Sequence, residues 1–260
     1  MWGFSHIVGG IMKVNKIYQG DCLEVMKDIP DKYVDAIITD PPYGTTACKW
    51  DSIIPLEPMW KQLKRIIKPN GAIIMSASQP FTTTLITSNI KMFKYCWIWN
   101  GVRAANFAQA PYMPLKNCED VVVFSFATIA ANSKNRMIYN PQGLTDIDKI
   151  CAGKKANDHR PGRSDQKPYK QTKTGYPNQI LEFKKDLKPI HPTQKPVALM
   201  EYLIKTYTNE GELVLDFTIG SGTTAVAAIQ TNRNFIGIEQ DHEYIKMAEQ
   251  RIKKAKHKLF

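Results

Sequence analysis

Residues 214–228 read VLDFTIGSGTTAVAA, and this stretch decides the fold class. Its first residues form the short apolar run of a buried parallel strand, and its last residues begin a helix. Between the two, Gly220 and Gly222 allow a ligand to approach the backbone closely, and the helix N-terminus offers free N–H groups. A glycine turn that serves only packing is the alternative. We favour a strand–turn–helix unit that binds a nucleoside, which predicts an α/β fold.

The residues around this loop indicate which nucleoside it binds. Glu239 ends the next predicted strand, seventeen residues after Gly222, where a carboxylate can accept hydrogen bonds from both ribose hydroxyls. Gly220, Gly222 and Ala225 also satisfy the GxGxxG/A pattern of dinucleotide sites, so the loop alone does not choose a cofactor. Asp216 would repel a pyrophosphate but attract a cationic amino-acid group. Because S-adenosylmethionine carries such a group, Asp216 favours this cofactor.

The rest of the chain shows the same alternation of strands and helices. The predicted strands are residues 33–40, 72–77, 95–99, 120–126, 212–217 and 235–239. The predicted helices are residues 55–67, 196–207, 223–230 and 244–258. This alternation predicts a mostly parallel central sheet with helices on both faces.

The composition is that of a globular protein, because 43% of the 260 residues are hydrophobic and 23% are charged. No apolar run approaches the roughly 18 residues that cross a bilayer, which argues against a membrane protein. Residues 1–12 lack the features of a signal peptide, and we expect them to be an extension. The five cysteines are odd in number and never at CxxC spacing. Their pattern argues against a metal site or a disulfide framework and indicates reduced thiols in a cytoplasm.

Positive charge is concentrated in one part of the chain. The net charge is +11, and residues 150–189 contain ten Lys or Arg but only four Asp or Glu. Strand-like runs vanish from about residue 130 to 187, a stretch too long for an idle connection. Aromatic residues that can stack on bases are interleaved with the cations. We therefore expect a nucleic-acid-binding insert rather than a solvated linker. Its expected contacts are Lys154, Lys155, Arg160, Arg163, Lys167 and Lys170.

Residues 39–44 read TDPPYG and follow the first predicted strand. The loop comes at the carboxyl edge of the sheet, where α/β proteins place their ligands. Pro41 and Pro42 stiffen the backbone, so the Asp40 carboxylate and the Pro41 carbonyl can be fixed in space, while Tyr43 offers a flat face. An ordinary proline turn is the alternative, but Asp-Pro-Pro-Tyr after a buried strand is much more specific.

These motifs, taken in order, resemble the β class of DNA amino-methyltransferases, in which Asp-Pro-Pro-Tyr precedes the target-recognition region and the cofactor loop comes last. The resemblance runs from about Val14 to Arg251. It implies a Rossmann-like, S-adenosylmethionine-dependent methyltransferase fold with an inserted target-recognition region, and an enzyme that methylates an exocyclic amino group of DNA. Phe217 and Thr218 depart from the family pattern, which has proline and an aromatic residue there.

The resemblance also implies roles for individual residues. Asp21 in QGDC (19–22) contacts the cofactor adenine, Lys195 in HPTQKP (191–196) lies near the methionine carboxylate, and Glu239 binds the ribose. The residues implied to line the cofactor are Asp40, Asp216, Phe217, Gly220, Ser221, Gly222 and Thr223. The implied catalytic residues are Asp40, Pro41, Pro42 and Tyr43. A flipped base would stack on Tyr43 and direct its amino hydrogens at Asp40 and the Pro41 carbonyl.

Asp40 favours N6 of adenine as the target, because family members that act on N4 of cytosine usually carry Ser-Pro-Pro-Tyr. N4 of cytosine is the nearest alternative, and methylation of RNA or protein is a more distant one. No cysteine follows a proline, which argues against methylation of cytosine carbon 5. Outside the family, a nicotinamide-dinucleotide oxidoreductase would explain only the glycine loop. A non-catalytic DNA-binding protein would explain only the basic insert.

These expectations divide the chain into four parts. Residues 1–12 are an extension, 13–130 the catalytic half, 131–189 the target-recognition insert and 190–260 the cofactor-binding half. S-adenosylmethionine is the expected cofactor. Double-stranded DNA is the expected partner, at the nucleoid in the cytoplasm of a bacterial or phage-infected cell, and neither a metal nor a membrane is expected. A homodimer and a cognate restriction endonuclease are left open as further partners.

Overall fold

The computed structural model describes residues 7–8, 11–45, 51–105, 107–153, 167–186 and 194–257. The chain divides into two compact units. The large unit consists of residues 1–140 and 179–260, and the small unit of residues 141–178. The large unit contains the sheet and the helices, so it contains the parts of the fold that position a site.

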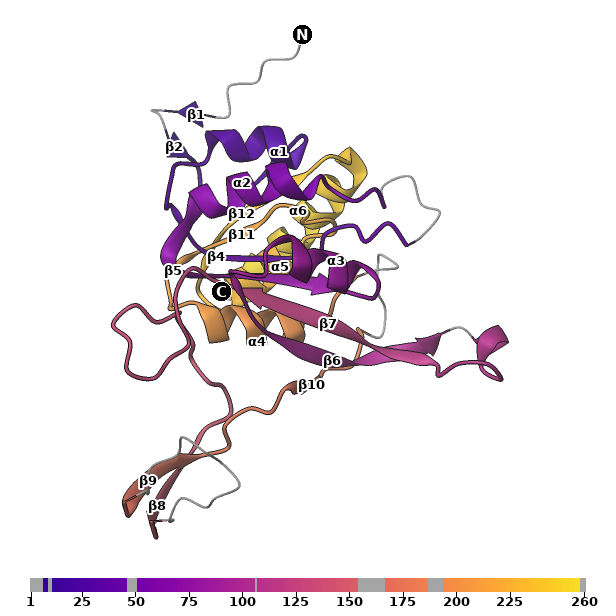
Figure 1. The fold of residues 1–260 in the computed structure, drawn as a ribbon. Coiled ribbons are helices and arrows are strands. Elements are labelled where there is room, and N and C mark those ends of the chain that lie inside the picture. The colour runs from indigo at the N-terminus through magenta and orange to yellow at the C-terminus, as the bar shows by residue number, and fades with distance from the viewer. Residues whose placement is uncertain are drawn as a thin grey trace. The chain divides into compact units, whose positions relative to one another are not determined.

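An eight-stranded sheet forms the centre of the large unit (Figure 1). Its strands, in spatial order, are β10 (Ile180–Glu182), β6 (Phe93–Ala105), β7 (Lys116–Phe124), β5 (Ile67–Ala77), β4 (Val34–Thr39), β11 (Leu213–Asp216), β12 (Asn234–Glu239) and β3 (Lys16–Gln19). In this sheet β7 runs antiparallel to both of its neighbours, and the other neighbouring strands run parallel. The prediction of a mostly parallel central sheet is therefore confirmed.

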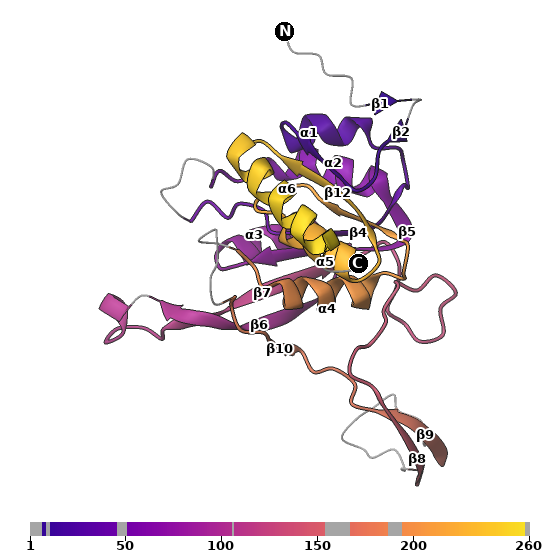
Figure 2. The ribbon, with the colours of Figure 1, turned by 180° about the vertical axis from the view of Figure 1, so that it is seen from behind.

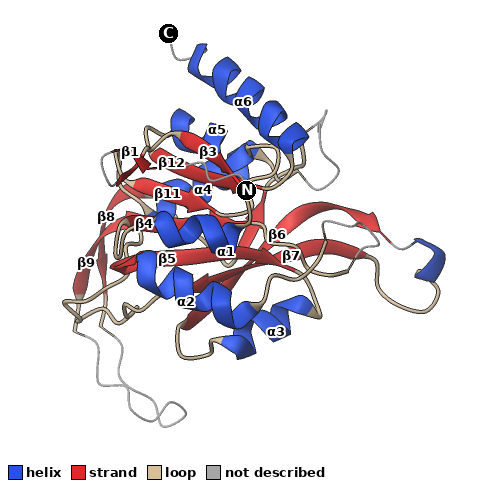
Figure 3. Ribbon diagram, turned by 90° about the horizontal axis from the view of Figure 1, so that it is seen from above, coloured by secondary structure: helices blue, strands red, loops and turns tan. Residues whose placement is uncertain are grey.

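Helices cover both faces of the sheet, as Figure 2 and the view from above in Figure 3 show. One face packs against α1 (Cys22–Val25), α2 (Leu56–Ile66) and α3 (Phe81–Ser88). The other face packs against α4 (Val197–Tyr207), α5 (Thr223–Gln230) and α6 (His242–His257). Alternating side chains of each strand supply the two cores: in β4, Ile37 points to the first core and Ala36 and Ile38 to the second. A strand that is buried on both faces forms a mainly apolar run, which is why the sequence predicted β4.

Several elements differ from their predicted extents. The strand expected at 72–77 begins earlier, at Ile67, and its register against β4 is irregular between Val34 and Ala36. β3, α1 and α3 had no prediction, and neither did two short 3₁₀ helices, η1 (Met26–Asp28) and η2 (Phe107–Gln109). Near the N-terminus, β1 (Ile7–Val8) and β2 (Ile11–Met12) form a small hairpin. Met12, the last residue of the expected extension, is buried in the core.

The expectation that residues 130 to 187 lack strands was wrong. The small unit contains an antiparallel hairpin of β8 (Thr145–Cys151) and β9 (Tyr169–Thr174), and β10 lies at the edge of the large sheet. In β8 and β9 no side chain is buried, and most are exposed, including Ile150. A strand that buries neither face has no alternation of apolar and polar residues, so the hydrophobic pattern missed it.

The large unit anchors the chain on both sides of the small unit. The backbone N–H of Asn140 donates to the carbonyl of Thr206, and its side chain donates to the carbonyl of Thr208 at the end of α4. The side chain of Gln179 donates to the carbonyl of Cys96 in β6. Both points at which the chain leaves and rejoins the large unit are therefore fixed by hydrogen bonds.

The described cysteines, Cys22, Cys96, Cys118 and Cys151, have free thiols, and Cys48 lies outside the described residues. No helix among the described residues is long and apolar enough to span a membrane.

The glycine before α5 gives a test of how tightly the fold packs around its glycine loop. Gly222 has a φ of 81°, and a Cβ built there would lie 2.7 Å from the Cβ of Ala248 on α6. Gly211 has nearly the same φ of 79°, but a Cβ there meets no described atom within 4 Å. We expect Gly211→Ala to lower the free energy of unfolding by about 1 kcal/mol through backbone strain. We expect Gly222→Ala to lower it by about 1–3 kcal/mol more through the clash. Urea unfolding of both variants measures the difference, and equal decreases would contradict the packing of α6 on this loop.

Candidate functional site

A cavity of about 810 Å³ opens where β4 and β11 end. The two strands are parallel neighbours, with Ala36 opposite Val214 and Ile37 opposite Leu215. After β4 the chain continues to α2 on one face of the sheet, and after β11 it continues to α5 on the other face. Open α/β sheets bind ligands at a point where the loops after two neighbouring strands turn to opposite faces, because the diverging loops leave a crevice.

The cavity brings together the sequence-predicted site residues of the large unit, apart from Gly222. Those in its lining are Asp21, Asp40, Pro41, Pro42, Tyr43, Lys195, Asp216, Phe217, Gly220, Ser221, Thr223 and Glu239. Gly222 is not among the residues that line the cavity, and its backbone packs closely against Ala248 of α6. Phe217 is almost fully buried in the core, in contact with the α1–α3 side of the sheet.

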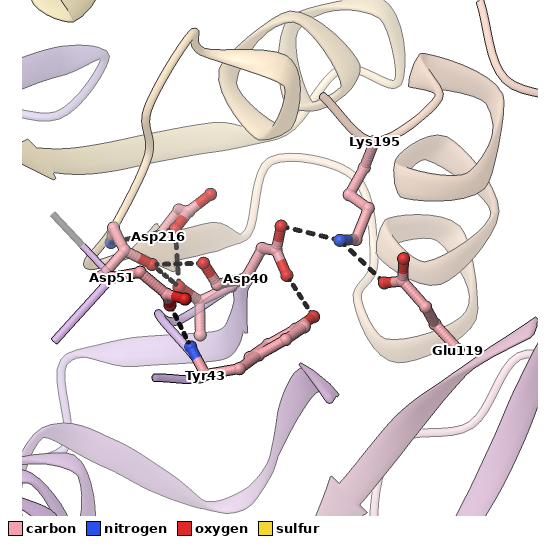
Figure 4. A network of polar contacts seen from close by, with 8 residues as sticks. Asp40, Tyr43, Asp51, Glu119, Lys195 and Asp216 are labelled. Carbon is pink, nitrogen blue, oxygen red and sulfur yellow. Dashed lines mark hydrogen bonds and ion pairs between the residues drawn. The ribbon is translucent and has the colours of Figure 1, made fainter. Parts of the chain in front are cut away.

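Both oxygens of the Asp40 carboxylate have partners (Figure 4). Oδ1 accepts a hydrogen bond of 2.5 Å from the hydroxyl of Tyr43. Oδ2 lies 2.8 Å from Nζ of Lys195, and the same Nζ lies 2.9 Å from Oε2 of Glu119 on β7. The catalytic aspartate predicted from the sequence is therefore fixed by a phenol on one side and an ammonium group on the other.

Tyr43 lies against Phe81 of α3, with ring centroids 5.5 Å apart and an angle of 21° between the rings. Burial raises the pKa of Tyr43 well above its ordinary value, and the charges of Asp40 and Glu119 raise it further. The phenol therefore stays protonated at neutral pH and acts as a hydrogen-bond donor to Asp40.

Asp51 fixes the backbone of the Asp-Pro-Pro-Tyr loop. Its Oδ1 accepts hydrogen bonds from the N–H groups of Tyr43 and Gly44, at 2.8 and 2.9 Å, and its Oδ2 accepts one from Thr45 at 2.9 Å. The side chain is buried and lines the cavity. Asp51 had no prediction, because a lone aspartate in a loop has no pattern that distinguishes it.

Thr218 links the Asp-Pro-Pro-Tyr loop to the glycine loop. The hydroxyl of Thr39 donates to Oδ1 of Asp216 at 2.7 Å and lies 2.7 Å from the hydroxyl of Thr218. The Thr218 hydroxyl in turn lies 3.2 Å from the carbonyl of Asp40. An aromatic residue without a hydroxyl, which the family pattern has at position 218, could not make these contacts, so this departure has a structural role here.

Asp216 is a buried carboxylate whose hydrogen bonds come from hydroxyl and amide groups. Burial raises the pKa of Asp216 to about 6, although hydrogen bonds from Thr224, Thr39 and the N–H of Thr218 favour the ionised form. A buried carboxylate in this state gains stability when a cation binds beside it. The amino group of S-adenosylmethionine is such a cation, so this residue fits the cofactor predicted from the sequence.

The carboxylates of Glu239 and Asp21 are fixed at the ends of β12 and β3. Glu239 accepts hydrogen bonds of 2.9 Å from the N–H groups of Gly220, Gln240 and Asp241. Asp21 caps α1 through the N–H of Leu23 and accepts a side-chain hydrogen bond from Gln240. A carboxylate can accept about four hydrogen bonds, so both retain capacity for ribose and adenine donors. The carboxylates of Asp21, Asp216 and Glu239 thus line one cavity, and as hydrogen-bond acceptors they fit S-adenosylmethionine.

Arg251 fixes the glycine loop from α6. Its Nη1 donates to the carbonyl and the hydroxyl of Ser221, at 2.8 and 3.0 Å, and to the hydroxyl of Thr223 at 3.0 Å. This residue was not predicted, since a basic residue on a charged helix gives no signal of its own. Ser221 and Thr223 therefore line the cavity with their hydroxyl groups already in contact with a cation.

The predicted DNA contacts fall mostly outside the described residues. Lys154, Lys155, Arg160 and Arg163 lie there, as do residues 191–193 of the HPTQKP motif. Lys167 and Lys170 belong to the small unit and are exposed. Nζ of Lys170 lies 3.0 Å from Asp148, in an exposed ion pair of the kind that contributes little to stability.

The sequence of the chain is similar to those of known DNA-modifying enzymes. A family model described as DNA methylase, N6_N4_Mtase, matches residues 34–250. The chain is 30% identical over 262 residues to DNA adenine methyltransferase YhdJ of Escherichia coli, covering 93% of this chain and 83% of that protein. It is 27% identical to Type II methyltransferase M1.MboII of Moraxella bovis, covering 92% of this chain and 96% of that protein.

Solved structures show the same likeness. The complex of M1.HpyAVI with S-adenosylmethionine is 26% identical, with a TM-score of 0.60, and the match covers 91% of this chain and 98% of that one. The cytosine-N4-specific PvuII DNA methyltransferase shares the fold at 15% identity, with a TM-score of 0.65 over 95% of this chain and 92% of that one.

Asp216 gives a pH test of the cavity. Its ionised fraction increases as the pH rises through about 6, and only the ionised form attracts the amino group of the ligand. We expect the affinity for S-adenosylhomocysteine to increase about fourfold between pH 5.5 and 7.0, as calculated from that ionised fraction. Isothermal titration calorimetry at both pH values measures the change.

Asp216→Asn is the matched control, because it keeps the shape of the side chain and removes the titration. Its affinity should be lower and nearly independent of pH over this range. A wild-type affinity that is flat between pH 5.5 and 7.0 would exclude Asp216 from the cation site.

Proposed function

Because the chain belongs to the N6/N4 DNA methylase family, we propose that it transfers a methyl group from S-adenosylmethionine to N6 of an adenine flipped out of double-stranded DNA. The observation that carries the proposal is the position of Asp40. Its carboxylate lines the cavity at the end of β4, beside Tyr43 and next to the end of β11. The carboxylate of Asp40, the ring of Tyr43 and the glycine loop thus line one cavity.

We assign the two ends of the cofactor to different residues of the cavity. Glu239 and Asp21 suit the ribose and adenine, because their carboxylates are fixed by backbone amides and retain acceptor capacity. Asp216 suits the amino group, because a cation beside it stabilises its buried charge. S-adenosylmethionine, when bound, supplies a methyl group on a positively charged sulfur.

The residues of the Asp-Pro-Pro-Tyr loop act on the base. The adenine amino group is a poor nucleophile, because its lone pair is delocalised into the ring. Asp40 and the Pro41 carbonyl accept its hydrogens, and the carboxylate stabilises the positive charge that develops on N6 during transfer. Asp51 holds three N–H groups of this loop, so the acceptors are in place before the base arrives. Tyr43 supplies the face for the flipped base.

Adenine is the proposed target because position 40 is aspartate rather than serine. A relative named as a DNA adenine methyltransferase supports this choice, and N4 of cytosine is the second candidate. The likeness to the cytosine-N4-specific enzyme concerns the fold alone. Residues 131–189 are the proposed target-recognition insert. A homodimer and a cognate restriction endonuclease stay expectations, the latter because several relatives are named type II methyltransferases.

The first test identifies the modified base. We expect DNA from cells that express the protein to contain N6-methyladenine and no new N4-methylcytosine. Mass spectrometry of digested nucleosides measures both, and single-molecule sequencing of the same DNA gives the recognition site. Asp40→Asn should lower methyl transfer by about 100- to 1000-fold, the usual cost of removing a charge-stabilising group at the reacting centre. Its fold and its affinity for S-adenosylhomocysteine should be retained. Near-wild-type activity of Asp40→Asn would refute the assigned mechanism.

The second test concerns the basic insert. A variant with Lys154, Lys155, Arg160 and Arg163 changed to Ala should bind DNA more weakly. Its salt dependence should be shallower by about one unit of slope for each phosphate that the variant no longer neutralises. A fluorescence titration of labelled duplex DNA across a salt series measures the slope.

The matched control removes the same charge elsewhere. Lys246, Lys253, Lys254 and Lys256 are exposed on α6, and changing these four to Ala should leave the slope nearly unchanged. A shallower slope in the α6 variant alone would place the DNA contacts on that helix and contradict the assignment to the insert.

A further inference from the structure

The ammonium group of Lys195 is shared by two carboxylates from different parts of the fold. Nζ lies 2.8 Å from Oδ2 of Asp40, after β4, and 2.9 Å from Oε2 of Glu119, on β7 (Figure 4). Lys195 is 7% exposed and the Glu119 side chain 12%. The contact with Glu119 has the distance of an ion pair but not the angles of a hydrogen bond. Glu119 therefore acts on Lys195 mainly through its charge.

Two aromatic rings complete the surroundings of this ammonium group. Nζ lies 5.7 Å from the ring centroid of Tyr43 and 5.8 Å from that of Trp99. Trp99 pairs with Glu119 across β6 and β7, and its indole N–H donates to the carbonyl of Phe183. Two carboxylates and two ring faces thus hold a buried cation in one place, each contact being favourable for the charged form.

The protonation of Lys195 follows from these contacts. Burial lowers the pKa of Lys195, but the charges of Asp40 and Glu119 outweigh burial and raise it overall. The side chain is therefore an ammonium group throughout the physiological pH range.

The charges of the three groups add to −1, whereas Asp40 and Lys195 alone would add to zero. This difference matters at the reacting centre, because a neutral pair stabilises a developing positive charge less than a net negative one. We propose that Glu119 is a positioning residue for methyl transfer: it holds Lys195 beside Asp40 and shares its charge, so that Asp40 faces the amino group of the base with net negative charge. This inference rests on the proposed role of Asp40 as the acceptor.

The sequence had placed Lys195 near the methionine carboxylate of the cofactor. That role stays a prediction. The structure gives this lysine two protein carboxylates as partners, and one of them is the proposed acceptor, Asp40. Glu119 also had no sequence prediction. The contact of Glu119 with Lys195 depends on the tertiary structure, which brings β7 beside the end of the Asp-Pro-Pro-Tyr loop.

Three variants test the proposal: Glu119→Gln, Lys195→Met and the two combined. We expect Glu119→Gln to lower kcat by about 10- to 100-fold, as is usual when the partner of a catalytic group is removed. The KM for S-adenosylmethionine should change by less than about twofold, because the two ends of the cofactor are assigned to Glu239, Asp21 and Asp216, which belong to other elements than Glu119. Lys195→Met should be more severe, since it leaves two partly buried carboxylates without a cation. The double variant should be more active than Lys195→Met, because it returns the site to one negative charge.

The pH dependence of kcat separates this role from a structural one. The charged and titratable groups around Asp40 are Lys195, Glu119, Tyr43 and Asp216. At saturating S-adenosylmethionine, Lys195→Met should move the acid-side midpoint of kcat to higher pH, because it removes a cation beside the acceptor. Glu119→Gln should move it to lower pH, because it removes a like charge. Unchanged midpoints in both variants would overturn the proposal.

Lys68 and Asp35 supply a matched control. They form an ion pair of 2.6 Å in which Asp35 is buried, and neither residue lines the cavity. Lys68→Met should leave kcat within about twofold of wild type, which shows that removing a partly buried ion pair alone does not lower activity. Thermal unfolding of every variant identifies any that fail to fold. If Glu119→Gln does not fold, the role of Glu119 is tested by comparing the kcat of the double variant with that of Lys195→Met.

The outcomes separate this inference from the proposed function. If Asp40→Asn is inactive and Glu119→Gln has the kcat of wild type, the role of Glu119 is refuted and that of Asp40 stands. A double variant less active than Lys195→Met also refutes it, because the effects of the two substitutions then simply add. If Asp40→Asn is active, the acceptor itself is misassigned.

Discussion

The pairing of β4 with β11 is the constraint on which the site depends. These strands are far apart in the sequence, yet the hydroxyl of Thr39 and the carboxylate of Asp216, 177 residues away, form a hydrogen bond where the strands end. A shift of one residue in this register would turn every side chain of one strand to the opposite face of the sheet. Apolar burial on both faces prevents that shift. The same burial that stabilises the sheet therefore aligns the base-binding loop with the cofactor loop.

The charges of the cavity favour a cationic ligand. Asp216 and Asp40 lie at the ends of neighbouring strands, Glu119 is nearly buried, and Lys195 is the cation among them. Burying carboxylates with too few cations is unfavourable, so the site is most stable when a positively charged ligand enters. A cavity of this kind favours a cationic methyl donor over a dinucleotide, whose pyrophosphate would add negative charge.

The sequence predicted the parts of the fold that are apolar and the parts of the site that form local motifs. β4, β11, β12, α4 and α5 were visible because their burial imposes a run or a periodicity on neighbouring residues. β8 and β9 were not, because neither strand has a buried face. The Asp-Pro-Pro-Tyr loop and the glycine loop are contiguous motifs, and their residues do meet in one cavity.

Asp51, Glu119 and Arg251 were missed for a common reason. Each acts through a contact with a loop or strand elsewhere in the chain, such as the bond from Arg251 to Ser221 thirty residues earlier. Their residue types are ordinary for their positions, and only the tertiary structure shows their partners. Gly222 is the converse case: it belongs to the motif, but its close contact with Ala248 shows that the motif encodes packing as well as ligand binding.

The fixed ends at Asn140 and Gln179 have a consequence for how this chain can diverge. The segment between them contributes no strand to the large sheet and none of the residues that line the cavity, as far as the described residues extend. Its two attachment points are held by hydrogen bonds to the end of α4 and to β6. Because the entropy of closing a loop changes slowly with its length, such a segment can be lengthened, shortened or exchanged at little cost to the rest of the fold. The large unit can therefore stay constant during evolution while the segment between Asn140 and Gln179 changes in length or sequence.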